Sequence, residues 1–168
     1  MTKQSHSRGF TVVELLVVIV IVAILATVTL VTYRGIQDRA KDAIRVQDAS
    51  MIVRALQAYN ARNGNYPNEQ SASWEDSYTY PTTFISALVS SDTVNAVPVD
   101  KVNTLSGGYY RYYRYPAGNS GCDATRGEFY VFQIIKPGGG TSPQSPGFSC
   151  SGRNWATEAW YTVGGYQL

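Results

Sequence analysis

The sequence contains very little histidine and cysteine. Its 168 residues include one histidine, His6, and two cysteines, Cys122 and Cys150. It also has no paired carboxylates at a catalytic spacing, no G-x-S-x-G nucleophile elbow and no phosphate-binding loop. His6 lies in the basic leader of the first nine residues, so a processed chain would have no histidine. A serine or aspartate without a histidine or an evident lysine base is a poor candidate for a nucleophile. The sequence therefore indicates that the protein is not an enzyme, and it predicts no cofactor.

Charged residues are also few. They make up 15% of the chain, whereas aromatic residues make up 12% and include 13 tyrosines. The first nine residues carry Lys3 and Arg8 and no acid, so the rest of the chain has 12 basic and 12 acidic side chains. Without net charge, that part lacks the positive field that attracts nucleic acid. We do not expect nucleic-acid binding through bulk electrostatics.

The two cysteines lie in segments rich in glycine, serine and proline. Cys122 and Cys150 are 28 positions apart, a spacing that does not match the paired C-x-x-C pattern of zinc sites. We predict that they form a disulfide, which implies an oxidising compartment outside the cytoplasm. Two buried free thiols are the alternative, and the polar neighbours of both cysteines disfavour it.

One long apolar run lies near the N-terminus. Residues 15–31 contain no charge, and residues 10–13 extend the run to the roughly 20 residues that cross a bilayer as a helix. Glu14 interrupts the run. A carboxylate at the edge of a membrane helix costs roughly 2 to 3 kcal/mol on insertion scales, so Glu14 is expected to have a partner or a role.

Beyond the apolar run, a helical pattern continues to the Asn63-Gly64 pair, with apolar residues at steps of three or four and charges on the other face. We predict one helix from Phe10 to Arg62, about 80 Å long. A module of about 100 residues is too small to bury that length, so the apolar half is expected to protrude.

Candidate strands follow at residues 109–115, 128–135 and 159–163, with a short helix near residues 81–90 and a flexible loop at residues 137–147. The order predicts an α+β fold, in which the C-terminal half of the long helix packs on an antiparallel sheet of three or more strands. Trp155, Trp160 and Tyr161 are interpreted as part of a closing core strand in preference to an adhesive patch.

The stretch RGFTVVELLVVIVIVAIL resembles the class III signal of type IV prepilins and type II secretion pseudopilins. The shared features are a short basic leader ending in Gly9, a phenylalanine at Phe10, Glu14 four residues further on, and the apolar helix. The resemblance implies that a prepilin peptidase cuts after Gly9 and that the amino group of Phe10 is methylated. It also implies that Glu14 attracts that amine on a neighbouring subunit and sets the register of a filament. An interfacial glutamate in an ordinary membrane anchor is the alternative.

The resemblance implies a pilin-like organisation in four parts: a cleaved cytoplasmic leader (1–9), a transmembrane and filament-core helix (10–33), its amphipathic continuation (34–63) and a globular β-rich domain (64–168). The subunit would lie in the cytoplasmic membrane before assembly and in an extracellular pilus afterwards. Its partners would be its own copies, other pilins, the peptidase, an assembly ATPase and a platform protein. Adhesion, twitching motility or DNA uptake would belong to the filament. A secretion pseudopilin is the rival, and a membrane-tethered binding module is a more distant one.

The run GGYYRYYRYPAG offers Tyr109, Arg111, Tyr113 and Arg114 as candidate surface-binding residues, because aromatic rings and arginines stack on bases or sugars. On a strand, however, the first three share one face and Arg114 lies on the other. A structural sheet with tyrosines in the core and in subunit contacts is therefore favoured over nucleic-acid binding.

Segment 97–103, VPVDKVN, occupies the place where major pseudopilins often carry a calcium loop. Calcium takes six or more oxygen ligands. Only Asp100 and Asn103, with Thr104, Ser106 or backbone carbonyls, are at hand. We therefore predict no metal site.

Overall fold

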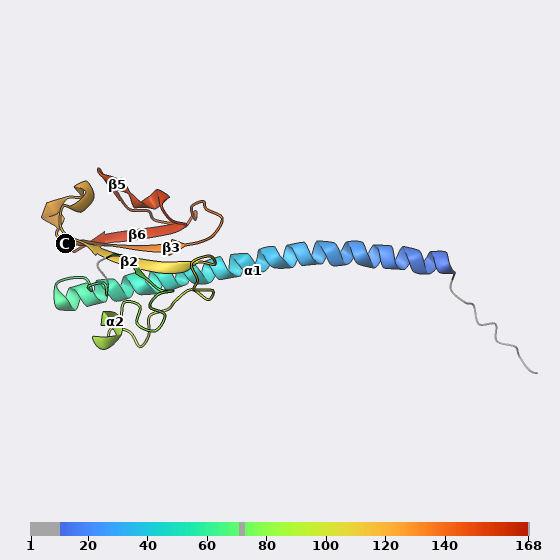
Figure 1. The fold of residues 1–168 in the computed structure, drawn as a ribbon, viewed down its shortest axis with the longest axis horizontal. Coiled ribbons are helices and arrows are strands. Elements are labelled where there is room, and N and C mark those ends of the chain that lie inside the picture. The colour runs from blue at the N-terminus through green and yellow to red at the C-terminus, as the bar shows by residue number, and fades with distance from the viewer. Residues whose placement is uncertain (1–10, 71–72, 168) are drawn as a thin grey trace, which may run out of the picture. The chain divides into compact units, whose positions relative to one another are not determined.

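The computed structural model describes residues 11–70 and 73–167, with only the backbone of residues 30–32 and 34. The chain divides into two compact units between Lys41 and Asp42. Helix α1 (Val12–Asn63) runs through the division and contributes to both units (Figure 1). The predicted helix is confirmed, and Phe10, its predicted first residue, lies outside the described residues.

The first unit contains the apolar part of α1. The segment Val12–Thr29 is long and apolar enough to cross a membrane, and none of it is buried within the structure. The hydroxyls of Thr27 and Thr29 donate to the carbonyls of Ala23 and Leu25 at 2.7 and 2.8 Å. These bonds matter because an apolar environment offers a hydroxyl no other partner.

The second unit contains a four-stranded antiparallel sheet in the order β1-β2-β3-β6. Its strands are β1 (Glu75–Asp76), β2 (Tyr109–Tyr115), β3 (Phe129–Ile135) and β6 (Tyr161–Tyr166). The predicted α+β fold is confirmed, and the three predicted strands are present with ends shifted by up to three residues. The sequence did not reveal β1, because two acidic residues have low strand propensity.

Shorter elements complete this unit. Helix α2 (Ala87–Ser90) occupies only the end of the predicted helical stretch 81–90, whose first part forms turns. Strands β4 (Ser149–Cys150) and β5 (Arg153–Asn154) pair as a small hairpin. Three 3₁₀ turns lie at Asn119–Gly121, Ala124–Arg126 and Trp155–Thr157.

One face of the sheet packs on the C-terminal part of α1 and forms the first core. The helix contributes apolar residues that recur every three or four positions, as an amphipathic face requires, and the strands contribute alternate residues. Its fully buried members include Ile52 and Leu56 of α1, Tyr110 and Tyr112 of β2, and Phe132 of β3.

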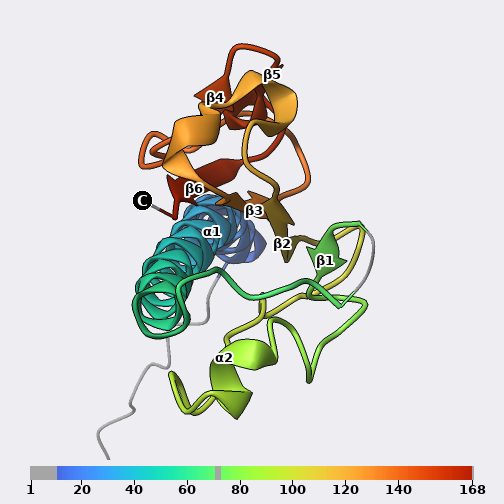
Figure 2. The same ribbon diagram turned by 90° about the vertical axis from the view of Figure 1, so that its left-hand side faces the viewer.

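The other face of the sheet carries a second core. It contains Phe129 and Val131 of β3, Tyr115 of β2, and Trp155, which is completely buried. Figure 2 shows the sheet between α1 and the β4–β5 hairpin. Trp155 and Tyr161 are core residues, as interpreted from the sequence, and Trp160 is partly buried. Only Tyr161 lies on the closing strand, β6, because Trp155 begins a 3₁₀ turn and Trp160 precedes the strand.

Candidate functional site

Glu14 closes the N-terminal end of α1. Its carboxylate oxygen Oε2 accepts hydrogen bonds from the backbone nitrogen of Thr11 at 2.9 Å and from the Thr11 hydroxyl at 2.8 Å. In return, the backbone N–H of Glu14 donates to the Thr11 Oγ1 at 3.2 Å. This reciprocal pair is a capping box, which satisfies backbone donors that a helix leaves free at its start. The negative charge therefore lies where the helix dipole favours it.

Thr11 is the residue that the sequence interpretation missed at this site. Its signal was present, because T-x-x-E immediately before an apolar run is the local signature of a capping box. Gly9 and Phe10, the predicted cleavage and methylation residues, lie outside the described residues.

The N-terminal segment of α1, which contains Glu14, is otherwise apolar on all its sides. Its large side chains are between 48% and 80% exposed from Val12 to Val28. A helix that is hydrophobic on all sides is unfavourable in water, and either lipid or other protein has to cover it. The arrangement is therefore an exposed apolar surface with one charge at its end.

Three of the four candidate surface-binding residues lie on the face of β2 that carries the second core, and each of them contacts other parts of the protein. Tyr109 is only 8% exposed. The guanidinium of Arg111 lies 4.3 Å from the ring centroid of Trp74, and its Nε donates to Gln133 at 2.8 Å. Tyr113 is partly buried, and its ring packs on that of Tyr115 at 4.6 Å between centroids.

Arg114 lies on the opposite face of β2. Its Nη1 is 3.1 Å from a carboxylate oxygen of Glu128 and donates to the carbonyl of Tyr66 at 3.3 Å. The structure does not bring the four residues together on one surface. Among the described residues, no group of three or more histidine, cysteine, aspartate and glutamate side chains could hold a metal ion.

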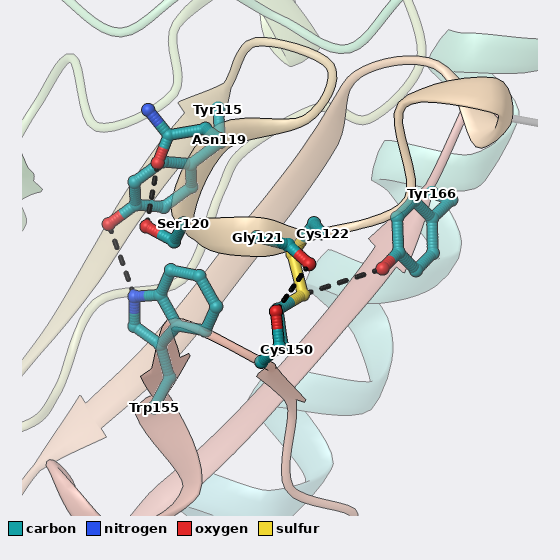
Figure 3. The surroundings of a disulfide bond; sticks show 9 residues. Tyr115, Asn119, Ser120, Gly121, Cys122, Cys150, Trp155 and Tyr166 are labelled. Carbon is teal, nitrogen blue, oxygen red and sulfur yellow. Dashed lines mark hydrogen bonds between the residues drawn. A yellow bond between two sulfur atoms is a disulfide. The ribbon is translucent and has the colours of Figure 1, made fainter.

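Cys122 and Cys150 are joined by a disulfide across a Cα–Cα distance of 4.9 Å. The bond ties the segment after the Asn119–Gly121 turn to β4, and a bond from the Ser151 hydroxyl to the Gly121 carbonyl at 3.0 Å runs beside it (Figure 3). Both cysteines contact the second core. The disulfide therefore closes this core.

Comparisons with known proteins agree with these features. Residues 4–30 match the family model of the prokaryotic N-terminal methylation motif, and this range includes Gly9, Phe10 and Glu14. No solved structure matches the chain.

Similarity also extends beyond the motif. Type II secretion system core protein G of Pectobacterium carotovorum is 30% identical over 133 residues, which cover 79% of this chain and 69% of the relative. The protein of the same name from Klebsiella pneumoniae is 30% identical over 80% of this chain and 79% of its own length. The type IV wide pilus major component PilA4 of Thermus thermophilus is 34% identical over 40% of this chain and 51% of its own length.

The motif, the exposed apolar helix and the α+β domain point to the same conclusion as these relatives. Family members are structural subunits that assemble into pilin-type polymers, and this is not a family of enzymes. The chain belongs to the family of type IV pilins and type II secretion pseudopilins.

Proposed function

We propose that the chain is the subunit of a type IV pilus or a related filament, which forms after a prepilin peptidase removes residues 1–9. The observation that carries the proposal is the apolar helix segment Val12–Thr29, which is exposed on all sides in the single chain. Lipid covers this segment before assembly, and the same segments of other copies cover it afterwards. Adhesion, twitching motility or DNA uptake would follow from the filament.

Glu14 is proposed to set the register between subunits by pairing with the amine of Phe10. In the single chain, the Glu14 oxygen Oε2 accepts both bonds from Thr11. The carboxylate is exposed, so it is accessible to a cation of another subunit. An unpaired charge inside a helical core of low polarity is strongly unfavourable, and a partner cation offsets much of that cost.

The proposal assigns residues 10–33 to the membrane span and filament core, 34–63 to the amphipathic continuation, and 64–168 to the outer domain. Residues 1–9 would face the cytoplasm before cleavage. An assembly ATPase and a platform protein would drive extraction from the cytoplasmic membrane into an extracellular filament of this chain and other pilins.

The first test is the intact mass and N-terminal sequence of the protein purified from its native cells. A start at methylated Phe10 is expected. An intact Met1 leader would refute the pilin function and leave a membrane-tethered binding module, with the Tyr109, Arg111, Tyr113 and Arg114 region as its candidate surface.

The second test is filament assembly of Glu14→Ala, measured as sheared filament protein per cell. A loss of filaments is expected, because the amine of Phe10 would lack its carboxylate partner in this variant. Asp38→Ala is the matched control, since Asp38 is an exposed acid on α1 outside the apolar segment, paired only loosely with Lys41 at 3.5 Å. Filaments of Glu14→Ala at the wild-type level would remove the proposed role of Glu14.

A secretion pseudopilin is the second candidate. The matches with core protein G of Pectobacterium carotovorum and Klebsiella pneumoniae extend over 79–80% of this chain, and the match with core protein G of Escherichia coli covers 40%, as the match with PilA4 does. Labelling of cell-surface filaments with an antibody against residues 64–168 would support the pilus. Loss of secreted proteins on deletion of the gene, without surface filaments, would support the pseudopilin.

A further inference from the structure

Segment 97–108 leads into β2 and includes residues 97–103, the place where major pseudopilins often carry a calcium loop. Two of the side chains that could serve as ligands are engaged within the protein. The amide of Asn103 donates to the Ser77 carbonyl at 2.9 Å, and its oxygen accepts from the Ser77 hydroxyl at 2.6 Å. The hydroxyl of Thr104 accepts from the backbone N–H of Gly107 at 3.0 Å. These oxygens point to protein donors, so the residues present do not fit a calcium ion.

Asp100, the one acid of the segment, already faces a cation. Its carboxylate accepts from Arg45 of α1 through Nε to Oδ2 at 2.5 Å and through Nη2 to Oδ1 at 3.3 Å. Oδ1 also accepts from the backbone N–H of Val102 at 2.8 Å. Asp100 is 3% exposed and Arg45 is 6% exposed. A forked, buried pair of this kind is among the stronger charge-assisted contacts in proteins.

Arg45 also contacts a second carboxylate, that of Asp42. Its Nη1 lies 3.1 Å from Oδ1 of Asp42, and the ammonium of Lys136 lies 2.6 Å from the other oxygen of Asp42. Burial alone would raise the pKa of Asp100, but its bonds to Arg45 and Val102 outweigh burial and hold that pKa below its ordinary value. These ion pairs link α1, segment 97–108 and the residue that follows β3.

Gly108 provides the space that the guanidinium occupies. It is buried and has a φ of 115°, in a region that side chains rarely adopt. A Cβ at this position would lie 3.0 Å from Nη2 of Arg45 and 3.1 Å from the carbonyl oxygen of Ile135. The glycine at position 108 therefore leaves room for the guanidinium of Arg45 to pack against the backbone just before β2.

We propose that the guanidinium of Arg45 is the resident cation that holds segment 97–108 on α1, so that the fold of the subunit needs no divalent metal. This inference goes beyond filament formation, because it concerns which ion stabilises the individual subunit. It also separates this chain from relatives that the resemblance associates with a calcium loop.

Thermal unfolding of the full chain in detergent, followed by circular dichroism, tests the proposal. The Tm of the wild type should be the same in millimolar CaCl₂ and in EDTA. Arg45→Met should lower the Tm by about 10 °C, because it leaves the Asp100 carboxylate buried without its cation. Arg54→Met is the matched control, since Arg54 is an exposed arginine of the same helix, and its Tm should stay near that of the wild type.

The double variant Arg45→Met with Asp100→Asn separates charge pairing from lost packing. It should recover part of the lost Tm, because the neutral amide can still accept from Val102 and no longer needs a cation. A wild-type Tm that rises with calcium or falls with EDTA would overturn the proposal, as would an Arg45→Met protein as stable as the wild type. If Arg45→Met does not fold, the calcium and EDTA measurements on the wild type still decide.

Discussion

The phenol of Tyr110 donates a 2.7 Å hydrogen bond to the Oδ2 of Asp48 and so joins β2 to α1 at the edge of the first core. Tyr110 is completely buried and Asp48 is partly buried. Burial raises the pKa of Asp48 above its ordinary value, and the bond from Tyr110 counteracts part of that rise. The hydrogen bond therefore connects the sheet to the helix and gives each of these polar groups a partner.

Replacing Tyr110 by phenylalanine is expected to lower the free energy of unfolding by about 1 to 2 kcal/mol, because the carboxylate of Asp48 loses a donor at a partly buried site. Urea unfolding measures the change. Tyr113→Phe is the control, since Tyr113 is partly exposed on the other face of the same strand. Equal effects of the two variants would show that the Asp48 bond contributes nothing specific.

Asp100 should make stability depend on pH in the acid range. Its folded-state pKa lies below the ordinary value of 3.8, so its contribution is complete above that value and is lost as pH falls through the folded pKa. Wild type should therefore be more stable than Asp100→Asn near neutral pH, and the difference should shrink as pH falls below the ordinary value.

Urea unfolding of both proteins across the acid range tests this sign. The raised pKa of Asp48 acts in the opposite direction. Burial, its main cause, is the same in both proteins, whereas the smaller contribution from the charge of Asp100 is absent in Asp100→Asn and slightly reduces the difference near neutral pH. A difference that is constant with pH would mean that Asp100 is not paired with Arg45 in solution.

Local signals in the sequence were sufficient for much of this fold. The tyrosine-rich run of β2 and the apolar run of β3 predicted strands. Alternating apolar residues indicate a strand with one buried face, and a short continuous apolar run indicates a strand with two buried faces. The T-x-x-E signature at Thr11 and Glu14 could also have been read, since a capping box involves residues only three positions apart.

Other features depend on partners far away in the chain. Glu75 of β1 is completely buried, yet its carboxylate accepts bonds from the backbone nitrogens of Gln70 and Ile85 and from the Gln70 amide. Arg45 and Asp100 are 55 positions apart. No local pattern distinguishes such a buried charge from an exposed one, so neither β1 nor the Arg45–Asp100 pair could be predicted.

The disulfide is expected to stabilise the folded domain, because it restricts the unfolded chain. Its 28-residue separation implies a contribution of roughly 3.5 kcal/mol in the chain-entropy account. The variant Cys122→Ser with Cys150→Ser should lose about that free energy of unfolding. Reduced wild type should behave in the same way, which controls for the substitutions themselves. Unfolding curves that do not change on reduction would contradict the expectation.

Two adjacent glycines of β6 each admit an aromatic ring from a different core. A Cβ on Gly164 would overlap the ring of Phe148, which packs on Trp155 in the second core. A Cβ on Gly165 would lie 2.8 Å from the ring of Tyr130 in the first core. Alanine at either position should therefore destabilise the domain by about 1 to 3 kcal/mol through overpacking.

The two substitutions should differ in which core they disturb. The indole N–H of Trp155, which donates to the Tyr115 hydroxyl at 3.2 Å, gives a specific NMR reporter of the second core. Gly164→Ala should shift this resonance strongly and Gly165→Ala only weakly, because successive residues of a strand face opposite sides of the sheet. Gly35→Ala is the control, since a Cβ there meets no atom within 4 Å and alanine favours the helix. Equal shifts of the Trp155 resonance in the two strand variants would show that the cores respond as one unit.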